Sequence, residues 1–240
     1  MREVQIGLIG AMQKEIAPYL DWMDSVHREQ IGPHQLWLGE AFGLSMAVGC
    51  CGIGKVNAAM GTQALLLGTR PGIVLHAGVG GGLVEGLRVG DAVVARDCVQ
   101  YDVDTTAMGD PLGMISTIDR IELPCDLRIA EGLLASAEET LPAGRRCVLG
   151  RVATGDRFLN DGEVKRRIVR DFGAYLCDQE SCAVAQVCFV NGVPCGVVRT
   201  VSDASDGAHQ SEYEQFSDGA ALAAAEIIWK FLEKFGAQFA

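Results

Sequence analysis

The stretch VQIGLIGAMQKEIAPYLDWM, residues 4–23, joins a short apolar run to a helical pattern through Gly10. The run at 4–10 predicts a strand, and the pattern at 13–23 predicts a helix distorted at Pro18. The same alternation continues along the chain, apart from a less regular region at 101–123. Further strands are expected at 43–50, 72–78, 91–97, 147–153, 174–178 and 194–203, and further helices at 52–69, about 126–140, 161–171, 181–192 and 211–236.

The expected strands are almost continuously apolar, which is typical of strands that helices cover on both faces. Strands that alternate with helices indicate an α/β fold. We therefore expect a three-layer α/β/α architecture with a mainly parallel, mixed central sheet. The 240 residues are 49% hydrophobic and no Pro/Gly/Ser-rich linker divides them, so one domain spanning 1–240 is expected.

The composition of the chain limits the ligands it is expected to bind and the compartment in which it is expected to act. The formal charge is -11, from 31 acidic and 20 basic side chains, which argues against nucleic-acid binding but not against a phosphate-free nucleoside. No apolar run reaches the roughly 18–20 residues of a membrane helix, and the start MREVQIGLIGAM does not fit a signal peptide. Nine scattered cysteines without a CxxC pair predict reduced thiols in the cytoplasm and no structural zinc site.

Several strands are followed by residues that could form a ligand site, because ligands in α/β folds gather where strands end and helices begin. Glu15 lies in the first turn of the helix after strand 4–10. Its alternative role is to complement the helix dipole. The glycine-rich segments CGIGKVNAA (51–59) and HAGVGGGL (76–83) are expected to be turns after strands, suited to a phosphate or to close packing.

Neither glycine-rich segment fits a nucleotide-binding motif closely. No Gly-Lys-Ser/Thr closes a Walker A sequence. GVGGGL only loosely resembles a dinucleotide fingerprint, since Gln100 and Tyr101 stand where an acidic residue is expected.

Two further strands end in charged residues. Asp178 and Glu180 interrupt the core-like stretch YLCDQESCAVAQVC, residues 175–188. In RTVSDASD (199–206), Arg199 could pair with Asp203 while Ser202 caps a turn, or Asp203 could be an acid at the edge of the sheet. Carboxylates from separate strand ends that converge on one crevice would suit a neutral, polyhydroxylated ligand and acid–base chemistry.

The motifs IGLIGAMQKEI, CGIGKVNAA, AGVGGGL, TGDRFL and VVRTVSDASD resemble those of the 5'-methylthioadenosine/S-adenosylhomocysteine nucleosidases, in the nucleoside phosphorylase superfamily. The resemblance runs in the family's order from residue 6 to about 216. It implies a nucleoside phosphorylase-like fold and hydrolysis of the N-glycosidic bond of those nucleosides. It further implies that no metal or organic cofactor takes part, and that the enzyme is a homodimer whose pocket is completed across the interface.

The resemblance also assigns roles residue by residue. Glu15 matches the glutamate that activates water, and Arg199 matches the arginine near that water. Asp203 matches the aspartate that protonates adenine N7, with Ser202 orienting it. Glu180 matches the glutamate that binds the ribose hydroxyls.

The remaining matched positions surround the nucleoside. Phe158 matches the aromatic residue that stacks on the purine, and Leu159 matches the residue whose backbone reads the purine edge. The other expected substrate-binding residues are Met12, Val79, Gly80, Met108, Asp178, Gln179, Tyr213 and Phe216.

Three departures from the family bear on the substrate. Gln179 replaces a methionine that lies against the ribose, so its amide must bond to the ligand or a neighbour, or point away. Asp178 replaces a glutamate, and Arg157 replaces a small residue beside Phe158.

Three alternatives stay open. The first is hydrolysis of 5'-deoxyadenosine or futalosine. The second is a phosphate-dependent nucleoside phosphorylase, which would need a glycine–aspartate–proline stretch near the N-terminus that this chain lacks. The third is a non-catalytic nucleoside-binding protein.

Overall fold

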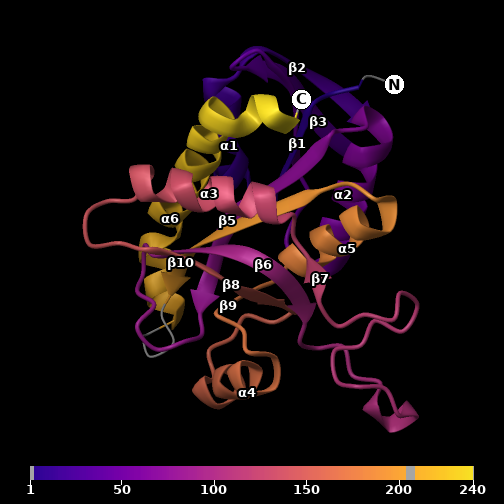
Figure 1. Cartoon of the computed structure of the whole chain (residues 1–240), viewed down its shortest axis with the longest axis vertical. Helices are drawn as coiled ribbons and strands as arrows, with labels where there is room; N and C mark the ends of the chain where they lie inside the picture. Colours follow the sequence, from indigo (N-terminus) through magenta and orange to yellow (C-terminus); the bar gives the residue numbers. More distant parts are fainter. Residues whose placement is uncertain (1–2, 204–208, 240) are drawn as a thin grey trace.

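The computed structural model describes residues 3–203 and 209–239 (Figure 1). Strands and helices alternate through this part of the chain, close to the expected order. The strands are β1 (Ile6–Gly10), β2 (Asp24–Ile31), β3 (His34–Ala41), β4 (Leu44–Cys50), β5 (Ile73–Gly82), β6 (Ala92–Gln100), β7 (Leu123–Pro124), β8 (Cys147–Thr154), β9 (Leu176–Asp178) and β10 (Cys195–Asp203). The helices are α1 (Gln13–Trp22), α2 (Lys55–Thr69), α3 (Leu127–Thr140), α4 (Gly162–Phe172), α5 (Ser181–Asn191) and α6 (His209–Phe235), with short 3-10 helices η1 (Thr106–Met108) and η2 (Gly236–Phe239).

The described strands form one mixed sheet in the order β10-β6-β8-β9-β5-β1-β4-β3-β2, with β7 beside β6. Parallel pairs join β1 to β4 and β5, β5 to β10, and β8 to β6 and β9. Because β5 also pairs with β10, the five strands β5, β10, β6, β8 and β9 close into a ring. Strands β1, β4, β3 and β2 extend outward from β5.

Helices cover both faces of the sheet, which confirms the three-layer α/β/α prediction. One core cluster packs α2 and α5 against the sheet through residues such as Leu65 and Val184. A second cluster packs α1, α3 and α6 against the other face, for example through Ile16, Leu133 and Phe231. Helix α4 lies apart from these layers, at the lower end of the molecule in Figure 1, over a smaller cluster that includes Ile168 and Phe172.

Two parts of the fold differ from the sequence prediction. The hairpin of β2 and β3 was not predicted, because β2 is largely exposed and polar and therefore lacks the apolar run of a buried strand. The segment GVGGG is not a turn but the end of β5, where all ten residues of the strand are buried. A side chain at Gly78 would collide with Arg199 and Glu15, so glycine is needed there for close packing.

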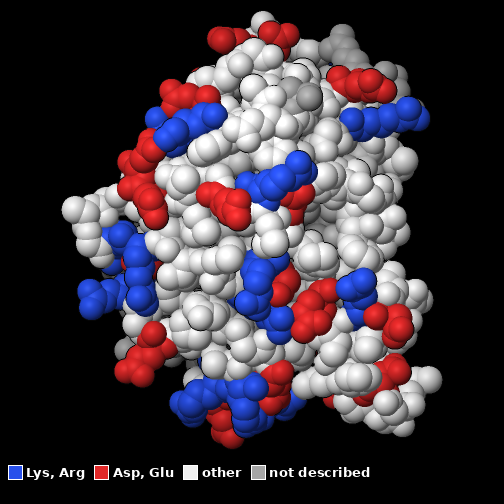
Figure 2. Space-filling model, in the orientation of Figure 1, with Lys and Arg blue, Asp and Glu red and all other residues white. Residues whose placement is uncertain are grey.

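Acidic and basic side chains are interspersed on the face seen in Figure 2, and no continuous basic surface covers that face. In the part of the chain that the structure describes, no helix has the length and apolar character needed to span a membrane.

Candidate active site

The ends of β1, β5, β9 and β10 meet at one pocket of about 560 Å³, including its open mouth. The segment after β8 and one side chain of α6 complete its wall. Its lining residues are Ala11, Met12, Glu15, Ile53, Val79, Gly80, Gly81, Arg157, Phe158, Leu159, Cys177, Asp178, Gln179, Glu180, Ser202, Asp203 and Tyr213.

Glu15 is held as a hydrogen-bond acceptor at the start of α1. Its Oε2 accepts from the backbone N–H groups of Ala11 (2.7 Å) and Met12 (3.0 Å), and its Oε1 accepts from Val79 N–H (3.2 Å). The side chain is only 2% exposed but lines the pocket. Glu15 therefore complements the dipole at the N-terminus of α1, which was its alternative role in the sequence analysis. At the same time it presents a carboxylate to the pocket.

Arg199, fully buried beneath the pocket, lies among three carboxylates. Its Nη2 is 2.8 Å from Asp178 Oδ2 and 3.4 Å from Glu180 Oε2, and its Nη1 is 3.7 Å from Glu15 Oε1. Burial acts against the charged guanidinium, but attraction to Asp178, Glu180 and Glu15 raises the pKa of Arg199 above its ordinary value. The predicted alternative of an Arg199–Asp203 pair is wrong, since Arg199 pairs with these three residues and Asp203 with Lys165.

His76 fixes the guanidinium from the other side. Its Nδ1 lies 2.7 Å from the Ile9 carbonyl oxygen, so this nitrogen carries the proton and donates. Nε2 is then free to accept a hydrogen bond from Arg199 Nη2. Burial, together with the positive charge of Arg199, holds the pKa of His76 well below its usual range, so the ring stays neutral.

Asp178 positions its neighbours more than it faces a ligand. It accepts hydrogen bonds from Thr154 Oγ1 (2.5 Å) and from the backbone N–H and hydroxyl of Ser181, besides pairing with Arg199. These contacts tie the end of β9 to β8, β10 and the first turn of α5.

Glu180 is more open to a ligand. Its Oε1 accepts from Gly54 N–H (2.9 Å), and its Oε2 faces Arg199. Burial raises the pKa of Glu180 from 4.5 to about 7; Arg199 opposes this rise and Asp178 adds to it. Glu180 therefore changes charge near neutral pH.

Asp203 receives two donors at the end of β10. Ser202 Oγ lies 3.0 Å from Oδ1, and the Lys165 ammonium nitrogen lies 3.3 Å from Oδ2. Sequence reasoning missed Lys165, which is 1% exposed on α4. The signal for it was a lysine at a position where the helical period of α4 places an apolar residue.

The opposite wall of the pocket is more apolar. The Phe158 ring, 46% exposed, meets the Tyr213 ring edge-to-face with centroids 5.7 Å apart, and Tyr213 OH lies 3.4 Å from Met12 Sδ. Leu159 is buried, whereas Gln179 is half-buried. Both residues line the pocket.

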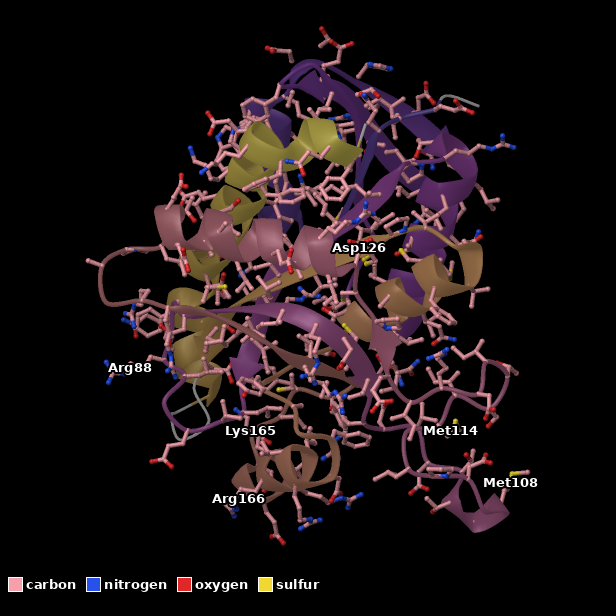
Figure 3. The ribbon with its side chains drawn as sticks, in the orientation of Figure 1. Arg88, Met108, Met114, Asp126, Lys165 and Arg166 are labelled. Atoms are coloured by element: carbon pink, nitrogen blue, oxygen red, sulfur yellow. The ribbon has the colours of Figure 1, made fainter. Side chains whose placement is uncertain are left out.

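Three expected site residues do not line the pocket of one chain. Arg199 lies behind its wall. Met108 is 84% exposed on η1, at the lower right of Figure 3, and Phe216 is 38% exposed on α6. The lining residues absent from the expected set are Ala11, Ile53, Gly81, Arg157 and Cys177. Among the described residues, no group of three or more His, Cys, Asp or Glu side chains could hold a metal ion.

Known proteins resemble this chain over nearly its whole length. The family model of the phosphorylase superfamily matches residues 5–233. A 5'-methylthioadenosine/S-adenosylhomocysteine nucleosidase of Haemophilus ducreyi is 36% identical, over 97% of this chain and 99% of its own.

Two solved structures extend the comparison. The nucleosidase of that type from Neisseria meningitidis, in complex with methylthio-immucillin-A, superimposes with a TM-score of 0.91 at 29% identity, over 96% of this chain and 99% of its own. Futalosine hydrolase of Helicobacter pylori superimposes with a TM-score of 0.90 at 31% identity, over 97% of this chain and 99% of its own. The chain belongs to the phosphorylase superfamily and, within it, to the family of the 5'-methylthioadenosine/S-adenosylhomocysteine nucleosidases.

Proposed function

We propose that this protein hydrolyses the N-glycosidic bond of 5'-methylthioadenosine, S-adenosylhomocysteine or both, releasing adenine and the 5-substituted ribose. The observation that carries the proposal is the placement of Glu15, Glu180 and Asp203 around one pocket, each at or shortly after the end of a different strand. Cleavage of this bond develops positive charge on the ribose and negative charge on the base, so it requires carboxylates on one side and a proton donor on the other.

Glu15 is the proposed base. Its Oε1 lies 3.7 Å from Arg199 Nη1, a nitrogen that has no hydrogen-bond partner in the described part of the chain. A water in the pocket can donate a hydrogen bond to Glu15, which lines the pocket, while the Arg199 guanidinium lies behind that carboxylate. Glu15 then takes a proton as the water oxygen bonds to the ribose carbon, and the remaining carboxylates stabilise the oxocarbenium-like transition state.

Asp203 is the proposed acid, and Ser202 orients its carboxyl group. The exposed ring of Phe158 offers a stacking surface for the purine, and the backbone of Leu159 lies beside it. Glu180 is proposed to bind the ribose hydroxyls, while Met12, Val79, Gly80, Gln179 and Tyr213 surround the sugar and its 5'-substituent.

A phosphorolytic reaction is disfavoured by the charges of the pocket. Glu15, Asp178, Glu180 and Asp203 line it, and Arg199, buried behind it, is already paired with three of these carboxylates. A phosphate dianion placed beside these carboxylates would be repelled by them.

The experiment that tests the proposal is an adenine-release assay in phosphate-free buffer. Methylthioadenosine, adenosylhomocysteine, 5'-deoxyadenosine and futalosine serve as substrates. We expect turnover without phosphate and the highest kcat/KM for the first or second substrate. Strict dependence on phosphate contradicts hydrolysis. A preference for futalosine, which would agree with the structural likeness to futalosine hydrolase at 31% identity, replaces the proposed substrates. No turnover of any substrate favours the binding-protein alternative.

We further propose a homodimer. An apolar stripe, defined by Ile53, Val56, Met60 and Leu67, runs along the outer side of α2, and each of its members is about half exposed or more. Exposed Val190 of the neighbouring helix α5 widens it, since Asn191 Nδ2 donates to Gln63 Oε1 of α2 across 3.0 Å. Contiguous exposed apolar surface marks interaction sites.

The stripe begins at the pocket, because Ile53 belongs to both. A second copy that covers the stripe therefore reaches the pocket mouth. In this arrangement the partner's Met108 can complete the 5'-substituent pocket, and Phe216 follows the lining residue Tyr213 by about one turn of α6.

The cellular compartment and the domain organisation of the enzyme are proposals as well. The nine cysteines, all within the described residues, carry free thiols, which supports a reducing compartment such as the cytoplasm. We propose that residues 1–240 act as one nucleosidase domain without a metal or organic cofactor.

A further inference from the structure

Lys165 occupies a position that helix packing would give to an apolar residue. Helix α4 buries Lys165, Ile168 and Phe172, spaced as one helical face, and exposes Arg166 and Arg167. Figure 3 shows Lys165 on the side of α4 toward the sheet and Arg166 on its outer side. A buried ammonium costs several kcal/mol unless it is paired, so its presence on this face requires a compensating role.

The compensating partner is the proposed acid. Lys165 Nζ lies 3.3 Å from Asp203 Oδ2, and the two side chains are 2% and 5% exposed. Ser202 Oγ lies 3.0 Å from the other carboxyl oxygen. Lys165 thus pairs with the carboxylate form of Asp203, whereas protonation of a purine requires a carboxylic acid.

We propose that Lys165 is a positioning residue that stores the proton which Asp203 passes to the purine. This inference rests on the proposed glycosidic cleavage. Lys165 acts through Asp203 and does not itself line the pocket.

The proton balance is complete without a further reactant. A proton moves from Lys165 Nζ to Asp203 Oδ2, while Asp203 gives a proton to purine N7. The electron pair of the C1'–N9 bond stays with the base, and the water oxygen bonds to C1' as Glu15 takes its proton. Exchange with solvent returns one proton from Glu15 to Lys165 after the products leave.

A purely structural ion pair makes a different prediction. A buried pair contributes little net stability, and its loss would disturb the pocket for every substrate equally. A stored proton matters only where the leaving group needs protonation. The two roles are separated by comparing methylthioadenosine with a 4-nitrophenyl 5-methylthioriboside, whose phenolate leaves without an acid.

The variants are Lys165→Met, Lys165→Arg and the matched control Arg166→Met, which removes an exposed cation one residue away on α4. For Lys165→Met we expect kcat on methylthioadenosine to fall about 10–100-fold, with KM within about twofold and the nitrophenyl rate within about threefold of wild type. Lys165→Arg is expected to have a kcat between those of Lys165→Met and the wild type. Arg166→Met is expected to have the kcat and KM of the wild type. Equal losses on both substrates, or no loss on either, overturn the proposal.

A double-mutant cycle of Lys165→Met with Asp203→Asn tests whether Lys165 acts through Asp203, and it needs methylthioadenosine as its only substrate. If Lys165 acts through Asp203, Lys165→Met lowers kcat less than about threefold in the Asp203→Asn background, and additive losses refute the coupling. Far-ultraviolet circular dichroism and the nitrophenyl rate report whether each variant is folded. A wild-type enzyme that cleaves no adenine nucleoside refutes the proposed function itself, whereas an active wild type with equal losses refutes only the role of Lys165.

Discussion

The backbone N–H of Gly54 donates a hydrogen bond to Glu180 Oε1 across 2.9 Å, although the two residues lie 126 positions apart in the sequence. Gly54 has φ 97° and ψ 158°, a conformation that is accessible essentially to glycine alone. The turn before α2 therefore holds the carboxylate that we assign to the ribose hydroxyls, and only a glycine can make this contact without strain.

Substitution Gly54→Ala tests this relationship. The new methyl group would lie 3.1 Å from Asp156 Oδ1 and force a backbone conformation that costs about 1–3 kcal/mol. We expect kcat/KM for the nucleoside to fall about tenfold and Tm to fall by several degrees. Gly43→Ala is the control, because Gly43 also has positive φ, at 75°, but nothing within 4 Å of the added carbon. The control should lose stability alone; an equal loss of kcat/KM in both variants contradicts the assigned link.

The charge of Glu180 should make stability depend on pH. Burial raises its pKa in the folded protein from 4.5 to about 7, so the folded state binds this proton more tightly than the unfolded state does. The resulting stabilisation is fully present below about pH 4.5 and is lost as the pH rises through about 7.

Comparison with Glu180→Gln isolates this effect, since the amide cannot ionise. The free energy of unfolding of the wild type, relative to that of the variant, should decrease by up to about 3 kcal/mol between pH 4.5 and pH 8. Urea denaturation at both pH values measures it. A constant difference between the two proteins argues that Glu180 is ionised throughout this range.

Gln179 is the departure that most affects the sugar site. It lines the pocket and is half-buried, so an amide left unpaired by the bound nucleoside would cost about 1–3 kcal/mol. We expect Gln179→Met to lower KM for methylthioadenosine about fivefold and to change kcat by less than about twofold. Initial rates on the four nucleosides of the panel provide the measurement. A rise in KM for one of them shows instead that the amide binds that substrate.

The apolar stripe on α2 should control the oligomeric state. Met60→Glu places a charge in the middle of the stripe, where Met60 is 48% exposed, and is expected to convert a dimer to a monomer with reduced activity. Leu222→Glu is the control, because Leu222 is 42% exposed but lies on α6. Light scattering after size-exclusion chromatography measures the mass. A monomeric wild type, or a dimeric Met60→Glu variant, contradicts the proposed interface.

The parts of the fold that the sequence predicts are those where burial leaves a periodic pattern. The expected strand at 194–203 is β10 apart from one residue at its start, and it opens on the apolar run CGVV. The hairpin at 24–41 left no comparable signal, because β2 exposes most of its side chains. The segment GVGGG was misread because glycine favours turns, whereas here it allows Arg199 and Glu15 to approach β5.

Within the site, residues at strand ends were predictable and their partners were not. Glu15, Glu180 and Asp203 interrupt apolar patterns, so each stands out in the sequence. Arg199 and Asp203, four residues apart on one strand, looked like a pair. Their true partners come from α4, β9 and α1, and side chains so distant in sequence can be matched only when the fold is known.

Closure of the ring between β5 and β10 has a consequence for self-association of the sheet. In the described part of the chain, the sheet order ends at β2 on one side, while on the other side β10 is already paired with β5. The free edge at β2 carries Asp24, Arg28 and Glu29, and charged side chains at such an edge oppose the strand-to-strand joining that leads to aggregation. Another copy of the chain thus gains little by extending the sheet, and association is directed to helical surfaces.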